Sequence, residues 1–265
     1  MSAAAQRVDS EPMLLESLDG GVRRLVLNRP AARNALSVGL MSALQQALGR
    51  TAAERECRVV VIAGAGPAFC AGHDLRELRA DPSRAAYERV FAQCSDLMQQ
   101  IVALPKPVIA EVHGIATAAG CQLVATCDLA VAAEDARFAT PGVNIGLFCS
   151  TPMVALTRAV GRKAAMEMLL TGDLVDAQKA LDWGLVNQVV PAAELEQATA
   201  ALAAKIAEKP PVTVATGKRA FYDQMELGAA RAYELASCAI SASFAHDEGR
   251  QGMDAFLEKR KPPKH

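Results

Sequence analysis

The chain lacks an excess of charge of either sign. Its 265 residues carry 28 Lys and Arg against 29 Asp and Glu, a formal net charge of −1 at pH 7. Proteins that bind nucleic acid gather basic residues into a patch, and the basic residues here are scattered. The balance therefore favours a small-molecule partner and no nucleic acid. With 51% hydrophobic residues, the chain is long enough to bury a full core.

Residues 1–21 contain no long apolar run. They carry four acidic residues, Asp9, Glu11, Glu16 and Asp19. This composition argues against a signal peptide, a transit peptide and a membrane span. We therefore expect no membrane partner.

The seven cysteines include no C-x-x-C pair and show no regular spacing. An odd number of unpaired thiols is typical of a reducing compartment, so we expect a cytoplasmic protein. Cys70 and His73 form one C-x-x-H motif. A structural zinc site normally needs four ligands, so this pair alone predicts no metal.

Short β-type runs alternate with helical ones. The spacing of apolar residues predicts strands at 22–27, 59–62, 108–112, 129–132 and 185–190, and helices at 37–48, 83–104, 152–160 and 163–170. Asp176 and Gly184 delimit another helix, as N-cap and as the residue after its end. Residues 193–257 look helical, with an interruption at 209–211. The sequence therefore predicts an α/β core followed by a helical region.

One segment, residues 105–128 (PKPVIAEVHGIATAAGCQLVATCD), predicts a binding site made of backbone. An apolar run passes through a turn of Gly, Ala and Thr into a helix that begins near Ala119. The first N–H groups of a helix are unpaired, and the helix dipole favours negative charge there. Because the turn carries almost no side chain, a ligand carbonyl can approach closely, as an oxyanion hole requires. The candidate for proton chemistry in this segment is Gln122, which cannot ionise.

Five segments resemble, in order and over nearly the whole chain, the enoyl-CoA hydratase/isomerase (crotonase) family. They are residues 27–37 (LNRPAARNALS), 66–78 (GPAFCAGHDLREL), 106–123 (KPVIAEVHGIATAAGCQL), 171–191 (TGDLVDAQKALDWGLVNQVVP) and 252–262 (GMDAFLEKRKP). The resemblance implies an α/β fold: a crotonase-like spiral of ββα units over residues 1–191 that binds acyl-CoA, then a helical trimerisation region over residues 192–265. It also implies a homotrimer or a dimer of trimers, with CoA as part of the substrate and no separate cofactor.

The resemblance also implies the roles of individual residues. The thioester carbonyl would be held by the backbone N–H groups of His73 and Ala119. Asp74 resembles the acid that braces the loop after the first donor, and Arg29 is a further candidate for the CoA phosphates. The positions implied to bind CoA are Ala31, Arg33, Ala35, Ala71, Asp74, Leu75, Arg76 and Lys259.

Two positions depart from the hydratase pattern. Hydratases resemble one another in two glutamates that hold and activate water, and the matching residues here are Gln122 and Gly142. General acid–base help contributes about 10²–10⁴-fold to such reactions. The sequence therefore predicts a hydratase-like lyase whose hydratase activity is weak or lost.

Three functions stay open at this point: a hydratase-like lyase, a decarboxylase, and a non-catalytic acyl-CoA-binding or regulatory protein. His73 and residues 143–146 look similar to methylmalonyl-CoA decarboxylase members, in which Cys149 aligns with a tyrosine. Ser150 aligns with the nucleophilic aspartate of a dehalogenase branch. Cys149 is either an acid or nucleophile or a small core thiol, and the His73 ring is either a proton carrier or a bystander. Glu111 either faces solvent or an interface, or supplies a carboxylate to a rebuilt site.

Overall fold

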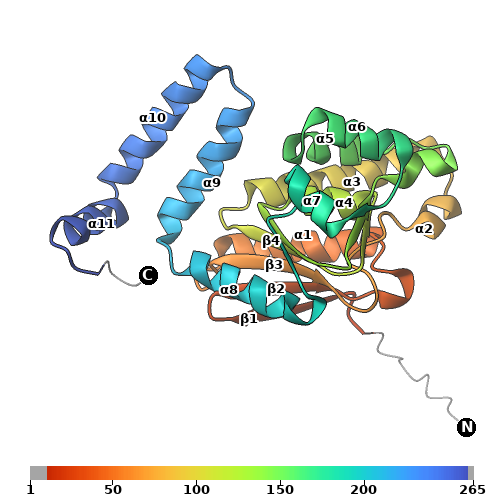
Figure 1. The fold of residues 1–265 in the computed structure, drawn as a ribbon, viewed down its shortest axis with the longest axis horizontal. Coiled ribbons are helices and arrows are strands. Elements are labelled where there is room, and N and C mark those ends of the chain that lie inside the picture. The colour runs from red at the N-terminus through yellow and green to blue at the C-terminus, as the bar shows by residue number, and fades with distance from the viewer. Residues whose placement is uncertain (1–10, 262–265) are drawn as a thin grey trace, which may run out of the picture.

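A six-stranded sheet forms the centre of the computed structural model, which describes residues 11–261 (Figure 1). The strand order is β1-β2-β3-β4-β6-β9, with β1 antiparallel to β2 and the other neighbours parallel. The strands are β1 (Leu14–Asp19), β2 (Val22–Leu27), β3 (Val59–Gly64), β4 (Val108–Val112), β6 (Leu129–Ala133) and β9 (Gln188–Val190). β3 and β4 are buried on both faces, which explains why they read as continuous apolar runs in the sequence.

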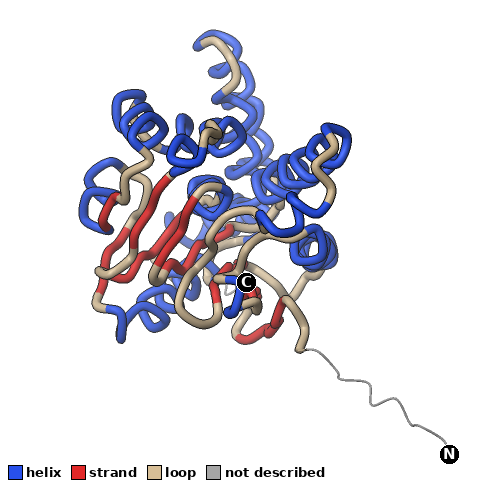
Figure 2. The backbone as a smooth tube through the Cα atoms, turned by 90° about the vertical axis from the view of Figure 1, so that its right-hand side faces the viewer, coloured by secondary structure: helices blue, strands red, loops and turns tan. Residues whose placement is uncertain are grey.

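Helices cover both faces of this sheet. Val60, Ile62 and Ala110 belong to a large core with α1 (Val38–Ala53), α3 (Arg84–Ala103) and α4 (Ala119–Thr126). The alternate residues of the same strands, such as Val61 and Ile109, pack against α8 (Leu195–Ala207) on the other face. Figure 1 shows α8 on one side of the strands and α1, α3 and α4 on the other, and Figure 2 shows the strands gathered among helices.

A smaller sheet lies beyond the carboxyl end of β4. It has the order β5-β7-β8 and consists of β5 (Ile115–Thr117), β7 (Arg137–Ala139) and β8 (Val175–Asp176). The remaining elements of this part are η1 (Pro30–Ala32), α2 (Leu75–Ala80), η2 (Pro141–Ile145), α5 (Ser150–Ala159), α6 (Arg162–Thr171), α7 (Ala177–Trp183) and η3 (Ala192–Glu194). Because β5 follows β4 after a short turn, it carries the chain directly into the start of α4.

The last three helices leave the sheet as an arm. They are α9 (Pro211–Met225), α10 (Ala229–Ala245) and α11 (Asp247–Leu257). Figure 1 shows α9 and α10 side by side and pointing away from the strands, with α11 at the end furthest from α2. No helix among residues 11–261 is long and apolar enough to cross a membrane.

Most of the predicted elements are confirmed, and the differences have local causes. The strand at 22–27 and the caps of α7 are as predicted: Asp176 accepts the N–H of Lys179, and Gly184 ends the helix at φ 84°. β1, β5, β7 and α2 were not predicted, because each is short and β1 buries only one of its six residues. The predicted strand at 185–190 is shorter, and the helical region breaks again after Met225 and at His246.

The predicted boundary at residues 191/192 stays a prediction. α8 follows it but packs on the sheet, so the chain leaves the sheet only at α9. Residues 1–10 and 262–265 of the two predicted regions lie outside the described part of the chain.

Candidate active site

The loop after β3 pairs with β5, and this pairing brings His73 to the start of α4. Cys70 forms a parallel bridge with Ala116, donating to the Ile115 carbonyl at 3.1 Å and accepting from the Thr117 N–H at 3.0 Å. The Thr117 hydroxyl adds a bond to the Ala71 carbonyl at 3.1 Å. Two segments that are more than forty residues apart in the chain are thus held in fixed register.

Two glycines allow these segments to approach closely. A Cβ on Gly120 would lie 2.0 Å from the Cys70 carbonyl oxygen, so only glycine fits there. Gly72 has φ +96°, and a Cβ on it would lie 3.0 Å from the Ala118 Cβ and 3.4 Å from the Ala119 nitrogen. The amide of Ala119 therefore lies directly beside the Gly72–His73 peptide.

Ala118 turns the chain sharply into α4. Its φ of 49° and ψ of −116° are rare for a residue with a side chain, a strain of the kind that clusters at functional sites. The Ala118 carbonyl points down the helix and accepts the Gln122 N–H at 2.9 Å. Since the N–H of a trans peptide points opposite to its carbonyl, the Ala119 N–H points out of the helix. Within residues 11–261, neither this N–H nor that of His73 donates to a backbone carbonyl.

The His73 ring does not join these amides as a proton carrier. It packs edge-on against Phe91, with ring centroids 5.2 Å apart, and both ring nitrogens are buried without a hydrogen-bond partner. Burial lowers the pKa of His73, and an interaction with the Leu36 backbone offsets this only in part. The ring is therefore neutral near pH 7 and forms part of a wall.

Gln122 and Thr140 are buried polar residues whose side-chain oxygens have no hydrogen-bond partner. Gln122 is 4% exposed, and its Oε1 atom has no hydrogen-bond partner. Thr140 is fully buried, and its hydroxyl oxygen is likewise unpartnered. No pattern in the sequence pointed to Thr140, although it lies directly before Pro141, between the end of β7 and the start of η2.

The Cys149 sulfur lies beside Gly142, the residue that the resemblance matches to a hydratase glutamate. A Cβ on Gly142 would lie 3.0 Å from the Cys149 sulfur and 2.8 Å from the Leu147 carbonyl oxygen. Burial raises the pKa of the Cys149 thiol, and the Gly142 backbone N–H opposes this only partly. A neutral thiol is a poor nucleophile, so this geometry fits a core thiol better than a nucleophile.

Ser150 is not prepared as a nucleophile. It is the first residue of α5, is exposed, and donates its hydroxyl to the Phe148 carbonyl at 3.3 Å. No basic side chain bonds to it among the described residues. A serine needs such a partner to be activated.

Arg29 and Asp74 brace the loops around the amide pair. Arg29 donates to Asp74 at 2.8 Å and to the Ala35 carbonyl at 2.6 Å. This ion pair lowers the pKa of Asp74, which also caps α2 by accepting the N–H groups of Arg76 and Glu77. Asp74 thus joins the two loops, as the resemblance implies for this acid, while its contact with CoA and that of Arg29 with the phosphates stay predictions.

The loop that contains Ala31, Arg33 and Ala35 lies beside the loop that contains Ala71. The Ala71 N–H donates to the Arg33 carbonyl at 3.0 Å, and Leu36 pairs with His73. Arg33 is exposed and takes a left-handed backbone, φ 48°. These residues form one rim near the amide pair, and their contacts with CoA stay a prediction.

The other residues predicted to bind CoA divide between the two ends of the molecule. Leu75 and Arg76 are exposed on α2, directly after the rim. Lys259 follows α11, which Figure 1 places at the opposite end from α2. Within one chain, Lys259 is therefore not brought to the site.

Glu111 has neither of the roles considered for it. It is 5% exposed and binds the Arg24 guanidinium through both oxygens, at 2.5 and 2.8 Å. It lies two residues after Ile109 in the same strand and therefore on the same face of the sheet, the one that α8 covers. The pair is a structural contact under α8.

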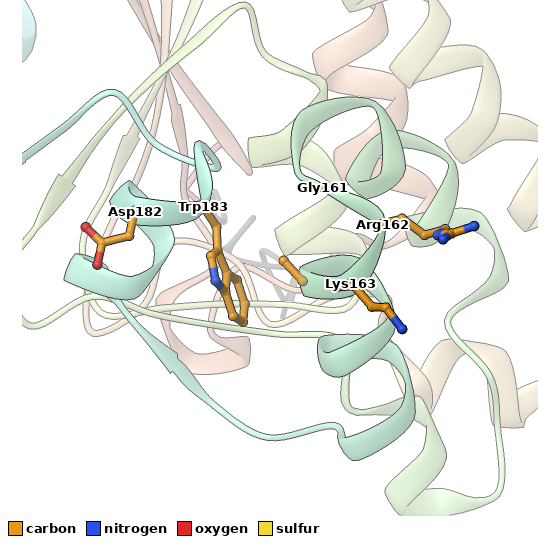
Figure 3. Close-up of a pocket in the computed structure, with 6 residues that line it drawn as sticks. Gly161, Arg162, Lys163, Asp182 and Trp183 are labelled. Atoms are coloured by element: carbon orange, nitrogen blue, oxygen red, sulfur yellow. The ribbon is translucent and has the colours of Figure 1, made fainter.

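Two other features lie outside the site. Among residues 11–261, no group of three or more His, Cys, Asp or Glu side chains could hold a metal ion. An open depression of about 550 Å³ lies between α6 and α7, where Figure 3 shows the Trp183 indole facing α6 and Arg162 and Asp182 pointing away. None of the predicted site residues lines it.

Comparison with known proteins agrees with the geometry. The sequence profile of the enoyl-CoA hydratase/isomerase family matches residues 18–264. The chain is 48% identical over 262 residues to human enoyl-CoA hydratase domain-containing protein 3, mitochondrial, covering 98% of this chain and 86% of the relative. A crystal structure of that human protein superposes with a TM-score of 0.92 at 47% identity, covering 95% of this chain and 99% of the other.

A crystal structure of an enoyl-CoA hydratase from Mycobacterium smegmatis is also similar. It superposes with a TM-score of 0.94 at 54% identity, covering 96% of this chain and all of the other. The predicted spiral of ββα units with a helical C-terminal region is therefore confirmed as the fold.

The predicted cytoplasmic location is wrong by the same comparison. The human relative, like its mouse and rat counterparts, is named as a mitochondrial protein. The prediction rested on unpaired cysteines, and these report the redox state of a compartment. Any reducing compartment satisfies that condition.

Proposed function

The chain belongs to the enoyl-CoA hydratase/isomerase (crotonase) family, and from this premise we propose that it binds an acyl-CoA thioester and stabilises the thioester enolate. The amides of His73 and Ala119 would hold the thioester oxygen. The observation that supports this is the pair of neighbouring amides, free of backbone acceptors and fixed by Gly72, Gly120 and the strained Ala118. Such donors act where charge develops, and loss of one costs about 2.7–4 kcal/mol of barrier.

Hydration by this site would be weak or lost. Adding water across a double bond needs a group that accepts a proton from water and one that returns a proton to carbon. Gln122 carries an amide, and the space beside Gly142 is filled by the Cys149 sulfur and the Leu147 carbonyl. Neither an amide nor a neutral thiol takes a proton from water near neutral pH.

Decarboxylation is the second candidate, because it does not need the missing base. A malonyl-type thioester loses its carboxylate as CO2, and the electron pair of the broken C–C bond becomes the enolate. The two amides would stabilise this enolate, and water would supply the proton that completes the product. The polar atoms of Gln122 and Thr140, unpartnered in the structure, would then contact the polar acyl group.

Self-association is part of the same proposal. The arm carries large exposed apolar side chains, including Tyr233 (76% exposed), Phe256 (82%) and Leu257 (75%). Burying them against further copies would give a trimer or a dimer of trimers. A neighbouring copy would also be needed to bring Lys259 to the rim around Arg33.

A substrate panel combined with calorimetry tests the proposal. Enoyl-, hydroxyacyl- and malonyl-type CoA esters are assayed for turnover and for binding. We expect binding throughout and slow or no hydration, with Gln122→Ala and Cys149→Ala changing any turnover while CoA binding persists.

The outcomes separate the candidates. Turnover of malonyl-type esters alone would favour the decarboxylase, and tight binding without turnover would favour a binding or regulatory role. Absence of binding to every CoA thioester would overturn the proposal.

A further inference from the structure

A small basic crevice lies at the amino ends of the central strands, at the opposite end of these strands from the amide pair. It has a volume of about 40 Å³ and is lined by Cys57, Arg58, Pro105, Lys106, Ile206, Lys209, Pro211 and Val214. Arg58 directly precedes β3, and Lys106 lies just before β4, at the amino ends of parallel strands. His73 and Ala119 follow the carboxyl ends of the same strands, so the crevice is separate from the acyl-CoA site.

The crevice is lined by three cations and by no carboxylate. Glu54, whose carbonyl accepts from Lys106, has its carboxylate bound by Arg23 at 2.5 Å. Glu56 and Glu208, which directly precede lining residues in the chain, are exposed and do not line the crevice. Among the described residues, no ion pair joins Arg58, Lys106 or Lys209 to an acid. Since the whole chain has a net charge of only −1, this concentration of positive charge is local.

Arg58 has a donor without an acceptor. Its Nη2 atom is buried and has no hydrogen-bond partner. The Arg58 side chain packs directly against Gly21. A Cβ added to Gly21 would lie only 2.9 Å from the Arg58 Cγ. A buried, unpaired guanidinium nitrogen costs free energy, so this site favours an acceptor.

Lys106 has a donor to spare as well. Its ammonium group donates to the carbonyls of Thr51, at 2.5 Å, and Glu54, which end α1. An ammonium has three N–H donors, so one is left after these two bonds. Burial lowers the pKa of Lys106, and the charges of Arg23 and Arg58 act in the same direction, against Cys57 and Glu54.

We propose that this crevice binds a small oxyanion, of the phosphate or carboxylate class, between Arg58, Lys106 and Lys209. A cavity needs about 10–15 Å³ of this volume to hold one water molecule. The crevice, at about 40 Å³, therefore suits a single phosphate or carboxylate group and is too small for a nucleotide. Lys209 lies between α8 and α9, whereas Arg58 and Lys106 lie just before the strands β3 and β4. The anion therefore ties the start of the arm to the core.

Thermal unfolding of the full chain in inorganic phosphate tests this site. The titration is made at constant ionic strength against chloride, with acetate as a third arm to distinguish phosphate from carboxylate binding. A ligand that binds only the folded state raises the Tm by an amount that grows with the logarithm of its concentration above the Kd and reaches several degrees at 100 times the Kd. Equilibrium dialysis with labelled phosphate is expected to give one site per chain.

Two pairs of variants locate the effect. Arg58→Gln and Lys209→Gln should each remove most of the rise in Tm, whereas the exposed neighbours Arg55→Gln and Lys205→Gln should keep it. Lys209 is itself exposed, so its variant folds even if Arg58→Gln does not. Acyl-CoA binding should be unchanged in all four.

Three results would overturn the proposal. They are a wild-type Tm that does not respond to either oxyanion, a rise that persists in both Arg58→Gln and Lys209→Gln, and a rise that is lost equally in the two control variants. Persistence in both site variants would assign the anion to another place, such as the CoA rim.

Discussion

At the scale of single residues, Gly142, which the resemblance matches to a hydratase glutamate, has no room for a side chain. A Cβ there would meet the Leu147 carbonyl at 2.8 Å and the Cys149 sulfur at 3.0 Å, so even the methyl group of an alanine would have to displace backbone. We expect Gly142→Ala to lower stability by about 1–3 kcal/mol, as overpacking does, measured by urea unfolding.

Gly217 provides the matched control. It lies inside α9, is exposed, and a Cβ on it would have nothing within 4 Å. Gly217→Ala should therefore raise stability by about 0.5–1 kcal/mol, because alanine favours a helix. Equal effects of the two substitutions would show that the loop around Cys149 is free to adjust.

A substitution at His73 changes its ring and keeps its backbone N–H, so it distinguishes the role of the ring from that of the amide. Burial keeps the folded-state pKa of His73 below the ordinary value of 6.5, so the unfolded chain binds the proton more readily. Its contribution to stability is thus complete above pH 6.5 and is lost as the pH falls below that value. We expect His73→Leu to flatten this part of the pH–stability profile and to retain acyl-CoA binding, since the backbone N–H remains.

A proton-carrying ring would give a different result. His73→Leu would then remove turnover with a loss that follows the titration of the ring, while the pH–stability profile changed little. Calorimetry of acyl-CoA binding and urea unfolding from pH 5.5 to 7.5 distinguish the two.

At the scale of elements, the sequence predicted what is encoded locally. The start of α4 followed from Gly and Ala around Ala119, and the ends of α7 from Asp176 and Gly184. The family resemblance supplied His73 as the second donor, which local patterns do not, because the pairing of Cys70 with Ala116 is a long-range contact.

Other parts of the site could not be predicted for the same reason. The partner of Glu111 is Arg24, which reaches it from β2 across β3, and no local pattern indicates that contact. The partner of Arg29 is Asp74, 45 residues away. The positive φ of Ala118 is imposed by its neighbours, since alanine alone does not favour it.

A buried ion pair joins α9 to the core. Lys218, with 7% of its side chain exposed, donates to Asp128 at 2.7 Å and to the carbonyls of Ile101 and Lys106, and Tyr222 donates to the same carboxylate at 2.8 Å. Removing one partner leaves a buried charge, so Lys218→Met should cost about 3–5 kcal/mol. Hydrogen exchange should show α9 opening before the sheet.

The neighbouring Arg219 is the control for this pair. It bonds Asp223 at 3.5 Å on the exposed side of α9, with 85% of its side chain exposed. Arg219→Met should change stability by less than about 1 kcal/mol. If Lys218→Met were equally mild, α9 would be held by apolar packing and not by the ion pair.

At the scale of the whole molecule, the arm predicts self-association. In light scattering we expect a trimer or hexamer for the wild type, and smaller species for Tyr233→Ser combined with Phe256→Ser, because exposed apolar surface drives assembly. Leu15→Ser, an exposed position on β1, should leave the mass unchanged. A monomeric wild type would contradict this part of the account.

In the proposed site, two backbone amides would polarise a thioester carbonyl, with Gln122 and Gly142 at the positions that match the hydratase glutamates. The most direct measurement is the ¹³C NMR shift of the thioester carbonyl in a labelled acyl-CoA, free and bound. Hydrogen bonds from His73 and Ala119 would withdraw electron density from that carbon, so we expect a clear downfield shift on binding, retained in His73→Leu. Binding with an unshifted carbonyl, or no binding, would contradict the proposal.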